Sequence, residues 1–155
     1  MNEQELFFRT IQSGNIDNVK AQLNTNPHVV NAVDARGFTP LIFATYFGQE
    51  AIAQLLIDNK AHVNAQDGSG NTALIGVSFK GNLELVHMLL KNNADVNIQN
   101  NKGATALIFA VQYNQEAIVK MLLQNNADVS IKDNDGKNAA DYAKEKEHTD
   151  LLELF

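Results

Sequence analysis

The feature that most constrains the fold is a sequence repeat that occurs three times in succession. The copies begin at Gly37, Gly70 and Gly103, and Gly136 opens a partial fourth copy, so that these glycines stand 33 residues apart each time. A fixed period in this range indicates an array of identical supersecondary units, each unable to bury its apolar face without neighbours. The period therefore predicts a stack of repeats, into which the rest of the chain is fitted.

Composition is typical of one ordinary folded domain. Apolar residues make up 45% and charged residues 19% of the 155 residues, which is the globular range. The formal net charge is -6, and the twelve basic residues are scattered along the chain. Phosphate binding depends on clustered Lys and Arg, so we expect no nucleic-acid partner.

Two absences exclude further classes of function. The chain has no cysteine, which excludes disulfides, thiolate metal sites and cysteine nucleophiles. The amino terminus carries acidic residues where a signal peptide needs basic ones, and no apolar run is long enough to span a membrane. We therefore expect no membrane partner and a cytoplasmic location.

Each copy predicts two helices joined by a tight turn. A threonine stands before the first helix as its N-cap, and the helix itself is apolar nearly all round, as expected between two neighbours. The second helix is amphipathic, with pairs such as Leu89 and Leu90 inward and Lys91 outward. The caps are Thr39, Thr72 and Thr105, and the turns lie at Gly48, Gly81 and Asn114.

Polar segments rich in Asn, Asp and Gly separate one copy from the next. Such clusters favour tight turns, so each boundary is predicted to form an extended, hairpin-like finger loop. Residues 2–13 place Leu6, Phe7 and Ile11 at helical spacing before Gly14 stops the helix. Residues 2–36 and 136–155 are thus expected to be diverged terminal repeats that cap the stack.

These residues resemble the ankyrin-repeat family, whose pattern is close to G-x-T-P-L-H-x-A, then a second helix ending LL, then G-A-D-V-N. The first half is matched by GFTPLIFA from Gly37, by GNTALIGV from Gly70 and by GATALIFA from Gly103. The second half is matched by segments such as LLKNNADVNIQN from Leu89. The resemblance implies an all-α ankyrin-repeat solenoid over residues 1–155, a single domain. Its full repeats would be residues 37–69, 70–102 and 103–135.

Two departures from the family pattern carry predictions. The family's histidine is replaced by Ile42, Ile75 and Ile108, which exchanges a polar contact between first helices for an apolar one. The glycine after the second helix becomes Lys60, Asn93 and Asn126. Asparagine accepts a left-handed conformation at modest cost, whereas lysine is more strained. We therefore expect the repeat around Lys60 to be locally less stable than its neighbour.

The rival function is an enzyme or metal-dependent hydrolase that uses Asp and His of the finger loops. None of the four histidines forms a metal-binding pair, and the Asp133 loop lacks the Glu that closes a calcium loop, since Lys144 stands there. Asn31, Asn64 and Asn97 recur at one position and could form an amide ladder that binds a ligand, but the resemblance implies that they brace the loop backbone. We therefore expect no catalytic, cofactor or metal site, and the capped ends argue against a fragment of a larger assembly.

The resemblance instead implies a non-catalytic protein-protein interaction module, expected to be monomeric. Such proteins present their finger tips and the exposed side of their first helices as a concave binding surface. Single rings could merely cover the neighbouring repeat, but an aromatic row flanked by Arg36, Lys80 and Lys102 favours a partner with apolar anchors and some negative charge. The predicted partner-binding residues are Arg36, Phe38, Tyr46, Phe47, Ser69, Asn71, Phe79, Lys80, Lys102, Gln112, Tyr113, Asp135 and Lys137.

Overall fold

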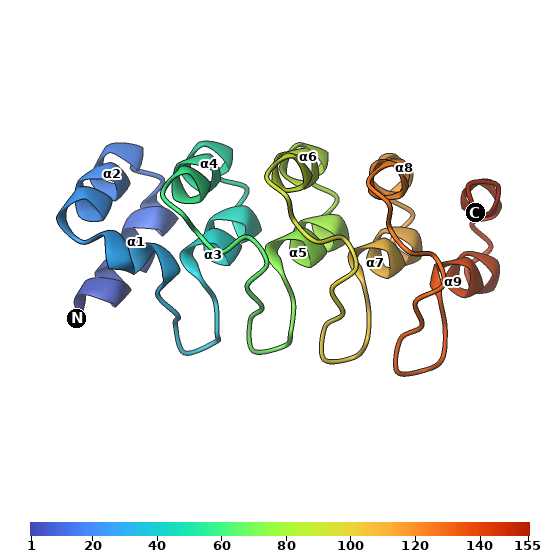
Figure 1. Cartoon of the computed structure of the whole chain (residues 1–155). Helices are drawn as coiled ribbons and strands as arrows, with labels where there is room; N and C mark the ends of the chain where they lie inside the picture. The colour runs from blue at the N-terminus through green and yellow to red at the C-terminus, as the bar shows by residue number, and fades with distance from the viewer.

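The computed structural model describes all 155 residues and contains helices without any β-strand (Figure 1). The α-helices follow one another in pairs along the molecule, with the two termini at opposite ends. This arrangement confirms the predicted all-α array. The elements are α1 (Glu3–Ser13), α2 (Ile16–Thr25), the 3₁₀ helix η1 (Pro27–Asn31), α3 (Pro40–Tyr46), α4 (Glu50–Asp58), α5 (Ala73–Lys80), α6 (Leu83–Lys91), α7 (Ala106–Gln112), α8 (Glu116–Gln124), α9 (Ala139–Glu145) and α10 (Thr149–Leu152).

The first helices of the pairs form one layer and the second helices form another, while the finger loops all extend in the same direction (Figure 1). Each finger is closed by backbone hydrogen bonds; for example, the Asp67 N–H donates to the Asn71 carbonyl at 2.9 Å and the Gly70 N–H to the Asp67 carbonyl at 2.9 Å. The fingers are therefore hairpin-like in their hydrogen bonding, although none contains a strand.

The predicted caps and turns are confirmed. The hydroxyl oxygens of Thr39, Thr72 and Thr105 each accept a backbone hydrogen bond at 3.2 Å from the isoleucine three residues further on. This bond satisfies one of the amide groups that a helix start leaves unpaired. The turns between helices contain left-handed residues, with φ of 70° at Gly48, 81° at Gly81 and 53° at Asn114.

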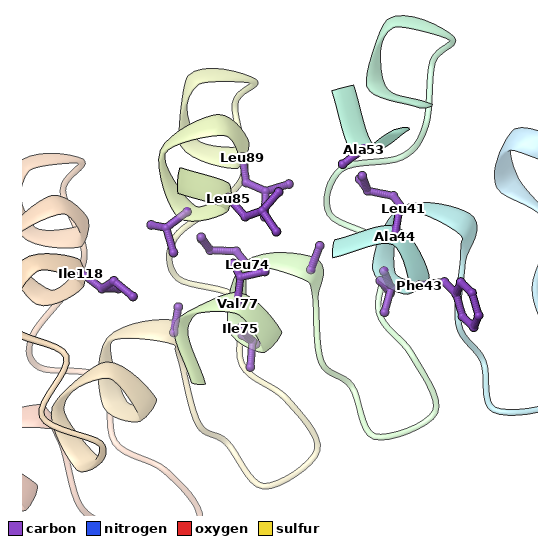
Figure 2. Close-up of a cluster of buried hydrophobic side chains, with 14 of the residues drawn as sticks. Leu41, Phe43, Ala44, Ala53, Leu74, Ile75, Val77, Leu85, Leu89 and Ile118 are labelled. Atoms are coloured by element: carbon purple, nitrogen blue, oxygen red, sulfur yellow. The ribbon is translucent and has the colours of Figure 1, made fainter. Parts of the chain in front are cut away.

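The core is one continuous cluster of 37 buried apolar residues that runs through every pair, so no pair has a core of its own. Figure 2 shows Leu74 of α5 pointing toward Leu85 and Leu89 of α6. All three side chains are buried. Ile42, Ile75 and Ile108 are buried as well, in agreement with their predicted apolar role.

One predicted core residue is wrong. Leu6 is 48% exposed, whereas Phe8 is 8% exposed and packs edge-on against Phe43 with 5.4 Å between ring centres. Helix α1 packs on α2, α3 and η1. As the terminal helix it has no neighbour on its other side, so Leu6 is left in solvent while Phe8 takes the inward position.

The recurring asparagines brace the loop backbone, as the resemblance implies, and their bonds run from one repeat to the next. Asn31 Oδ1 accepts from the His62 N–H at 2.9 Å, and Asn64 accepts from the Asp95 N–H at 2.8 Å. Asn97 accepts from the Asp128 N–H at 2.8 Å. Each bond fixes the loop of one repeat to the next one. The chain contains no helix with the length and apolar character needed to cross a bilayer.

Candidate functional site

The finger tips form a hydrogen-bonded ladder along one edge of the molecule. The Gly68 N–H donates to the Arg36 carbonyl at 3.1 Å, and the Asn101 N–H donates to the Ser69 carbonyl at 3.0 Å. The Asn134 N–H donates to the Lys102 carbonyl at 2.9 Å. A turn with no neighbour would be mobile, but these bonds fix the spacing of all four fingers.

The aromatic residues predicted to bind a partner lie beside this ladder in two clusters. In the first aromatic cluster, Phe38 lies 6.1 Å from Tyr46, and Tyr46 lies 5.2 Å from Phe47, measured between ring centres. In the second aromatic cluster, Phe79 lies 4.7 Å from Tyr113 and 6.0 Å from Phe109. The structure therefore divides the predicted row into two groups of rings.

Most of these rings are open to solvent. Tyr46, Phe47, Phe79 and Tyr113 are 44–52% exposed, although Phe47 also packs on the buried Phe43 at 4.8 Å. Phe38 is half-buried. Exposed rings held in place by neighbouring rings are the groups from which interface hot spots are built.

Lys80 connects the repeat of the first aromatic cluster to the repeat that carries Phe79. Its Nζ lies 3.5 Å from the centre of the Tyr46 ring and donates to the Tyr46 carbonyl at 2.6 Å. It forms no ion pair with a carboxylate. The positive charge of Lys80 is therefore not neutralised within the chain.

Arg36 is not a free cation, in contrast to the expectation that it would attract an acidic partner. Its guanidinium forms an ion pair with Asp34 at 2.7 Å and lies 4.3 Å from the centre of the Phe38 ring. Burial opposes the ionisation of Asp34, but hydrogen bonds from Arg36 and from the Phe38 N–H outweigh it and lower the pKa of Asp34. Arg36 thus serves to hold Phe38 at the first finger.

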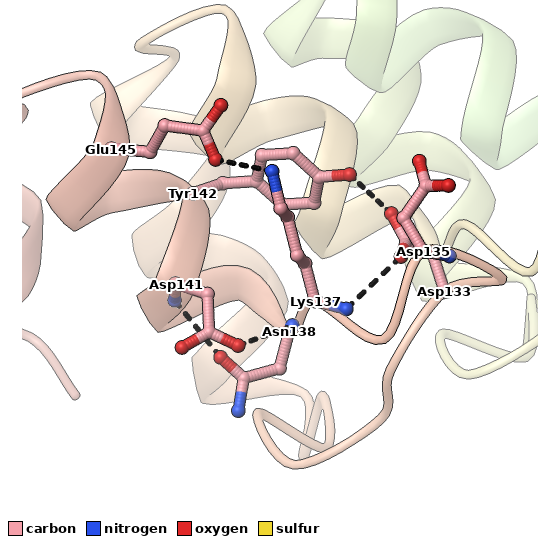
Figure 3. Close-up of polar contacts among 7 residues, drawn as sticks. All are labelled: Asp133, Asp135, Lys137, Asn138, Asp141, Tyr142 and Glu145. Carbon is pink, nitrogen blue, oxygen red and sulfur yellow. Dashed lines mark hydrogen bonds and ion pairs between the residues drawn. The ribbon is translucent and has the colours of Figure 1, made fainter.

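Lys137 is also engaged within the chain, in a polar cluster at the carboxy-terminal end (Figure 3). Its Nζ pairs with Glu145 at 2.6 Å, and its backbone N–H donates to Asp133 Oδ1 at 3.1 Å. The Tyr142 hydroxyl donates to the other oxygen of Asp133. The carboxylate of Asp133 therefore holds the last finger against α9, which favours the predicted turn over a calcium loop.

The other predicted residues are spread over the finger tips and helix ends. Ser69, Asn71 and Lys102 line a shallow hollow between the second and third fingers. Lys102 and Asp135 are exposed, and Gln112 is half-buried at the end of α7. No group of three or more His, Asp and Glu side chains comes together in a way that could hold a metal ion.

Sequence reasoning missed one feature, an apolar pocket of about 280 Å³ between the two aromatic clusters. It is lined by residues of α3, α5 and α7, among them Tyr46, Ile75, Gly76, Phe79 and Phe109. Alignment of the repeats could have indicated this pocket, because Gly76 occupies the position that is Phe43 in the preceding repeat and Phe109 in the next.

Comparison with known protein families agrees with this architecture. A family model described as ankyrin repeats in three copies matches residues 7–100 and, in a second match, residues 74–155. The two overlapping matches cover the helix pairs from the first to the last.

Proposed function

Because this chain belongs to the ankyrin-repeat family, whose members are generally protein-protein interaction modules, we propose that it binds a protein partner through one face. We call this the binding face: the finger tips together with the exposed side of α3, α5 and α7. In this function the chain acts as a single domain of three full repeats between two capping repeats, without a catalytic step.

The observation that carries the proposal is the exposure of large rings on this one face. Tyr46, Phe47, Phe79 and Tyr113 all lie there with about half of their surface in solvent. Aromatic residues are enriched at the centres of protein interfaces, where they bury a large area with little loss of conformational entropy. Two pairs of such rings on one face are more than the scattered apolar residues of an ordinary surface.

The rigidity of the face supports the same function. Binding costs less free energy when the binding groups are already ordered. Here the finger tips are bonded to one another, and Lys80 and Arg36 hold Tyr46 and Phe38 in place. We therefore expect the backbone of this face to move little when the partner binds.

The experiment is capture of the partner by a variant with Phe38→Ala, Tyr46→Ala and Phe79→Ala combined. Affinity capture from the native host with the wild-type protein first identifies the partner. The triple variant is then expected not to capture this partner, while its circular dichroism spectrum stays that of the wild type. A matched variant with three alanines on the outer side of the second helices, at Lys91, Lys120 and Gln124, should retain the partner. Unchanged capture by the triple variant of the binding face would overturn the proposal.

A further inference from the structure

The pocket at Gly76 interrupts an otherwise regular pattern of aromatic side chains. At the equivalent position, Phe43 fills the space between α1 and α3, where it packs on Phe8. Phe109 occupies it in the next repeat and packs on Phe79. Between them, Gly76 has no side chain, and the surrounding rings leave a cavity of about 280 Å³ that opens to the binding face.

The backbone at Gly76 does not require glycine. A Cβ added there would meet no atom within 4 Å, and its φ lies outside the left-handed range. Glycine inside a helix is destabilising relative to alanine. The chain thus carries an unfavourable residue at a position where the fold would accept a larger one, and the consequence of that residue is the open pocket.

The size and lining of the pocket indicate what it can hold. Cavities for drug-sized molecules measure about 300–1,000 Å³, so this pocket, at about 280 Å³, is slightly smaller than that range. Its walls are largely apolar, formed by Ile42, Ile75, Phe79 and Phe109 among others. A single aromatic or large aliphatic side chain, inserted from a partner, fits this space and this chemistry.

A polar hollow adjoins the pocket on the side of the finger tips. The two share Asn71 and Phe109, and the hollow contains Lys102 but no carboxylate. The Lys102 side chain makes no ion pair. The side-chain carbonyl of Asn71 accepts a hydrogen bond from Asn100 at 2.9 Å, whereas the side-chain amide hydrogens of Asn71 have no acceptor within the chain. The Asp67 carboxylate also lines the pocket, but it accepts the backbone N–H groups of Ser69 and Asn71, each at 2.9 Å. At the opposite rim, Glu50 and Glu84 line a separate hollow together with Lys80.

We propose that the Gly76 pocket binds one apolar side chain of the partner, and that an Asp or Glu next to this anchor in the partner's sequence binds Lys102 and Asn71. The inference rests on the proposed function and specifies the chemistry of the partner. Charge complementarity sets the direction of the partner segment. Its carboxylate points toward Lys102 at the finger tips, where the hollow contains no acidic residue, and away from the opposite rim, where Lys80 already contacts Tyr46 and shares its hollow with Glu50 and Glu84.

The test is selection of binders from a displayed library of random 12-residue peptides on the wild-type protein. The enriched peptides are expected to share an aromatic or large aliphatic residue with an Asp or Glu within about three positions. Gly76→Phe, which fills the pocket with the residue of the neighbouring repeats, should weaken their binding by about 30-fold or more, the loss typical of a hot spot. Lys102→Met should weaken it by about 3- to 10-fold and reduce its dependence on salt.

Two controls keep the result interpretable. Gly76→Ala adds one methyl group and leaves most of the pocket open, so binding should stay within a few-fold of the wild type. Gln124→Phe adds a ring on the outer side of α8 and should change nothing. Enriched peptides without an apolar anchor, full binding to Gly76→Phe, or no enrichment at all would overturn the inference.

The same peptides distinguish this inference from the proposed function. If they bind Gly76→Phe normally but fail to bind the Phe38, Tyr46 and Phe79 triple variant, the binding face stands and the pocket does not. If they bind the triple variant normally as well, the binding face itself is wrong.

Discussion

The ammonium group of Lys80 lies 3.5 Å from the centre of the Tyr46 ring and donates a 2.6 Å hydrogen bond to the carbonyl of the same residue, across the boundary between two repeats. In a stacked array, stability depends on such contacts between neighbours as much as on each unit alone. The pair therefore serves two purposes, since it joins α3 to α5 and holds a half-exposed ring on the binding face.

Lys80→Met tests the structural part of this contact. The variant keeps an apolar stem of similar length but loses the cation and the hydrogen bond, so the free energy of unfolding should fall by about 0.5–1.5 kcal/mol. Urea denaturation followed by circular dichroism measures it. Lys102→Met is the matched control, because the Lys102 side chain makes no hydrogen bond or ion pair, and it should change stability by less than about 0.5 kcal/mol. Equal effects of the two substitutions would contradict the role given to Lys80.

Lys60→Gly should stabilise the protein. Lys60 has a φ of 72° after α4, where the equivalent Asn93 and Asn126 have φ of 67°. A left-handed lysine is strained, and glycine removes the strain while adding freedom to the unfolded chain, so the net gain should be about 0.5–1 kcal/mol. The melting temperature in thermal unfolding measures this gain. Asn93→Gly should raise the melting temperature less, and a lower melting temperature for Lys60→Gly would show that the lysine is not strained.

The asparagine braces should differ in their contribution to stability. Asn31 accepts from the His62 N–H at 2.9 Å and also donates to the Lys60 carbonyl at 3.2 Å, whereas Asn64 makes only the bond to the Asp95 N–H. Asn31 is also the less exposed of the two. We expect Asn31→Ala to cost about 1–2 kcal/mol and Asn64→Ala about 0.5–1 kcal/mol in chemical denaturation. The reverse order would mean that the hydrogen bond from Asn31 to the Lys60 carbonyl does not contribute to stability.

Features that recur in every repeat could be predicted from sequence because they depend on local chemistry. Thr72 caps its helix because an apolar run follows it, and the role of Asn97 as a brace for the loop backbone was implied by the family resemblance. The left-handed conformation of Lys60 followed in the same way from its place in the period. For such residues, the position in three aligned repeats is enough to predict the conformation or role of the side chain.

Features that depend on a particular neighbour could not be predicted in this way. Leu6 and Phe8 both fit a helical stripe, and only the packing of α1 against α3 decides that Phe8 is buried. Arg36 and Lys137 were expected to be open to a partner, yet each is paired with a carboxylate of its own repeat. The pocket at Gly76 arises from side chains of three helices, and one glycine indicates it only when it is compared with Phe43 and Phe109.

The contact between Tyr142 and Asp133 predicts how stability depends on pH. Burial raises the pKa of Asp133, but hydrogen bonds from the Tyr142 hydroxyl and from the Lys137 and Asp135 N–H groups outweigh it, and the pKa lies below its ordinary value. The ionised carboxylate thus stabilises the fold above about pH 4, the ordinary Asp value, and this contribution is lost as the pH falls through the lowered pKa.

The same contact acts in the opposite sense at high pH. The hydrogen bond to Asp133, together with burial, raises the pKa of Tyr142 above its ordinary value of about 10. A raised pKa favours the neutral hydroxyl in the folded state. Its contribution is therefore fully present below about pH 10 and is lost as the pH rises through the raised pKa.

Tyr142→Phe removes the contact while keeping the ring in the core, so its effect should be largest between these limits. We expect the free energy of unfolding to fall by about 1–2 kcal/mol at pH 7, as for a hydrogen bond to a charged group, with the difference from wild type shrinking below about pH 4 and above about pH 10. Urea denaturation at several pH values measures it. Tyr113→Phe is the control, because the exposed Tyr113 hydroxyl makes no hydrogen bond within the chain and its loss should leave the pH profile unchanged. A Tyr142→Phe profile parallel to that of the wild type at all pH values would show that the hydroxyl of Tyr142 does not hold Asp133 in its ionised form, and that the last finger is fixed to α9 by packing alone.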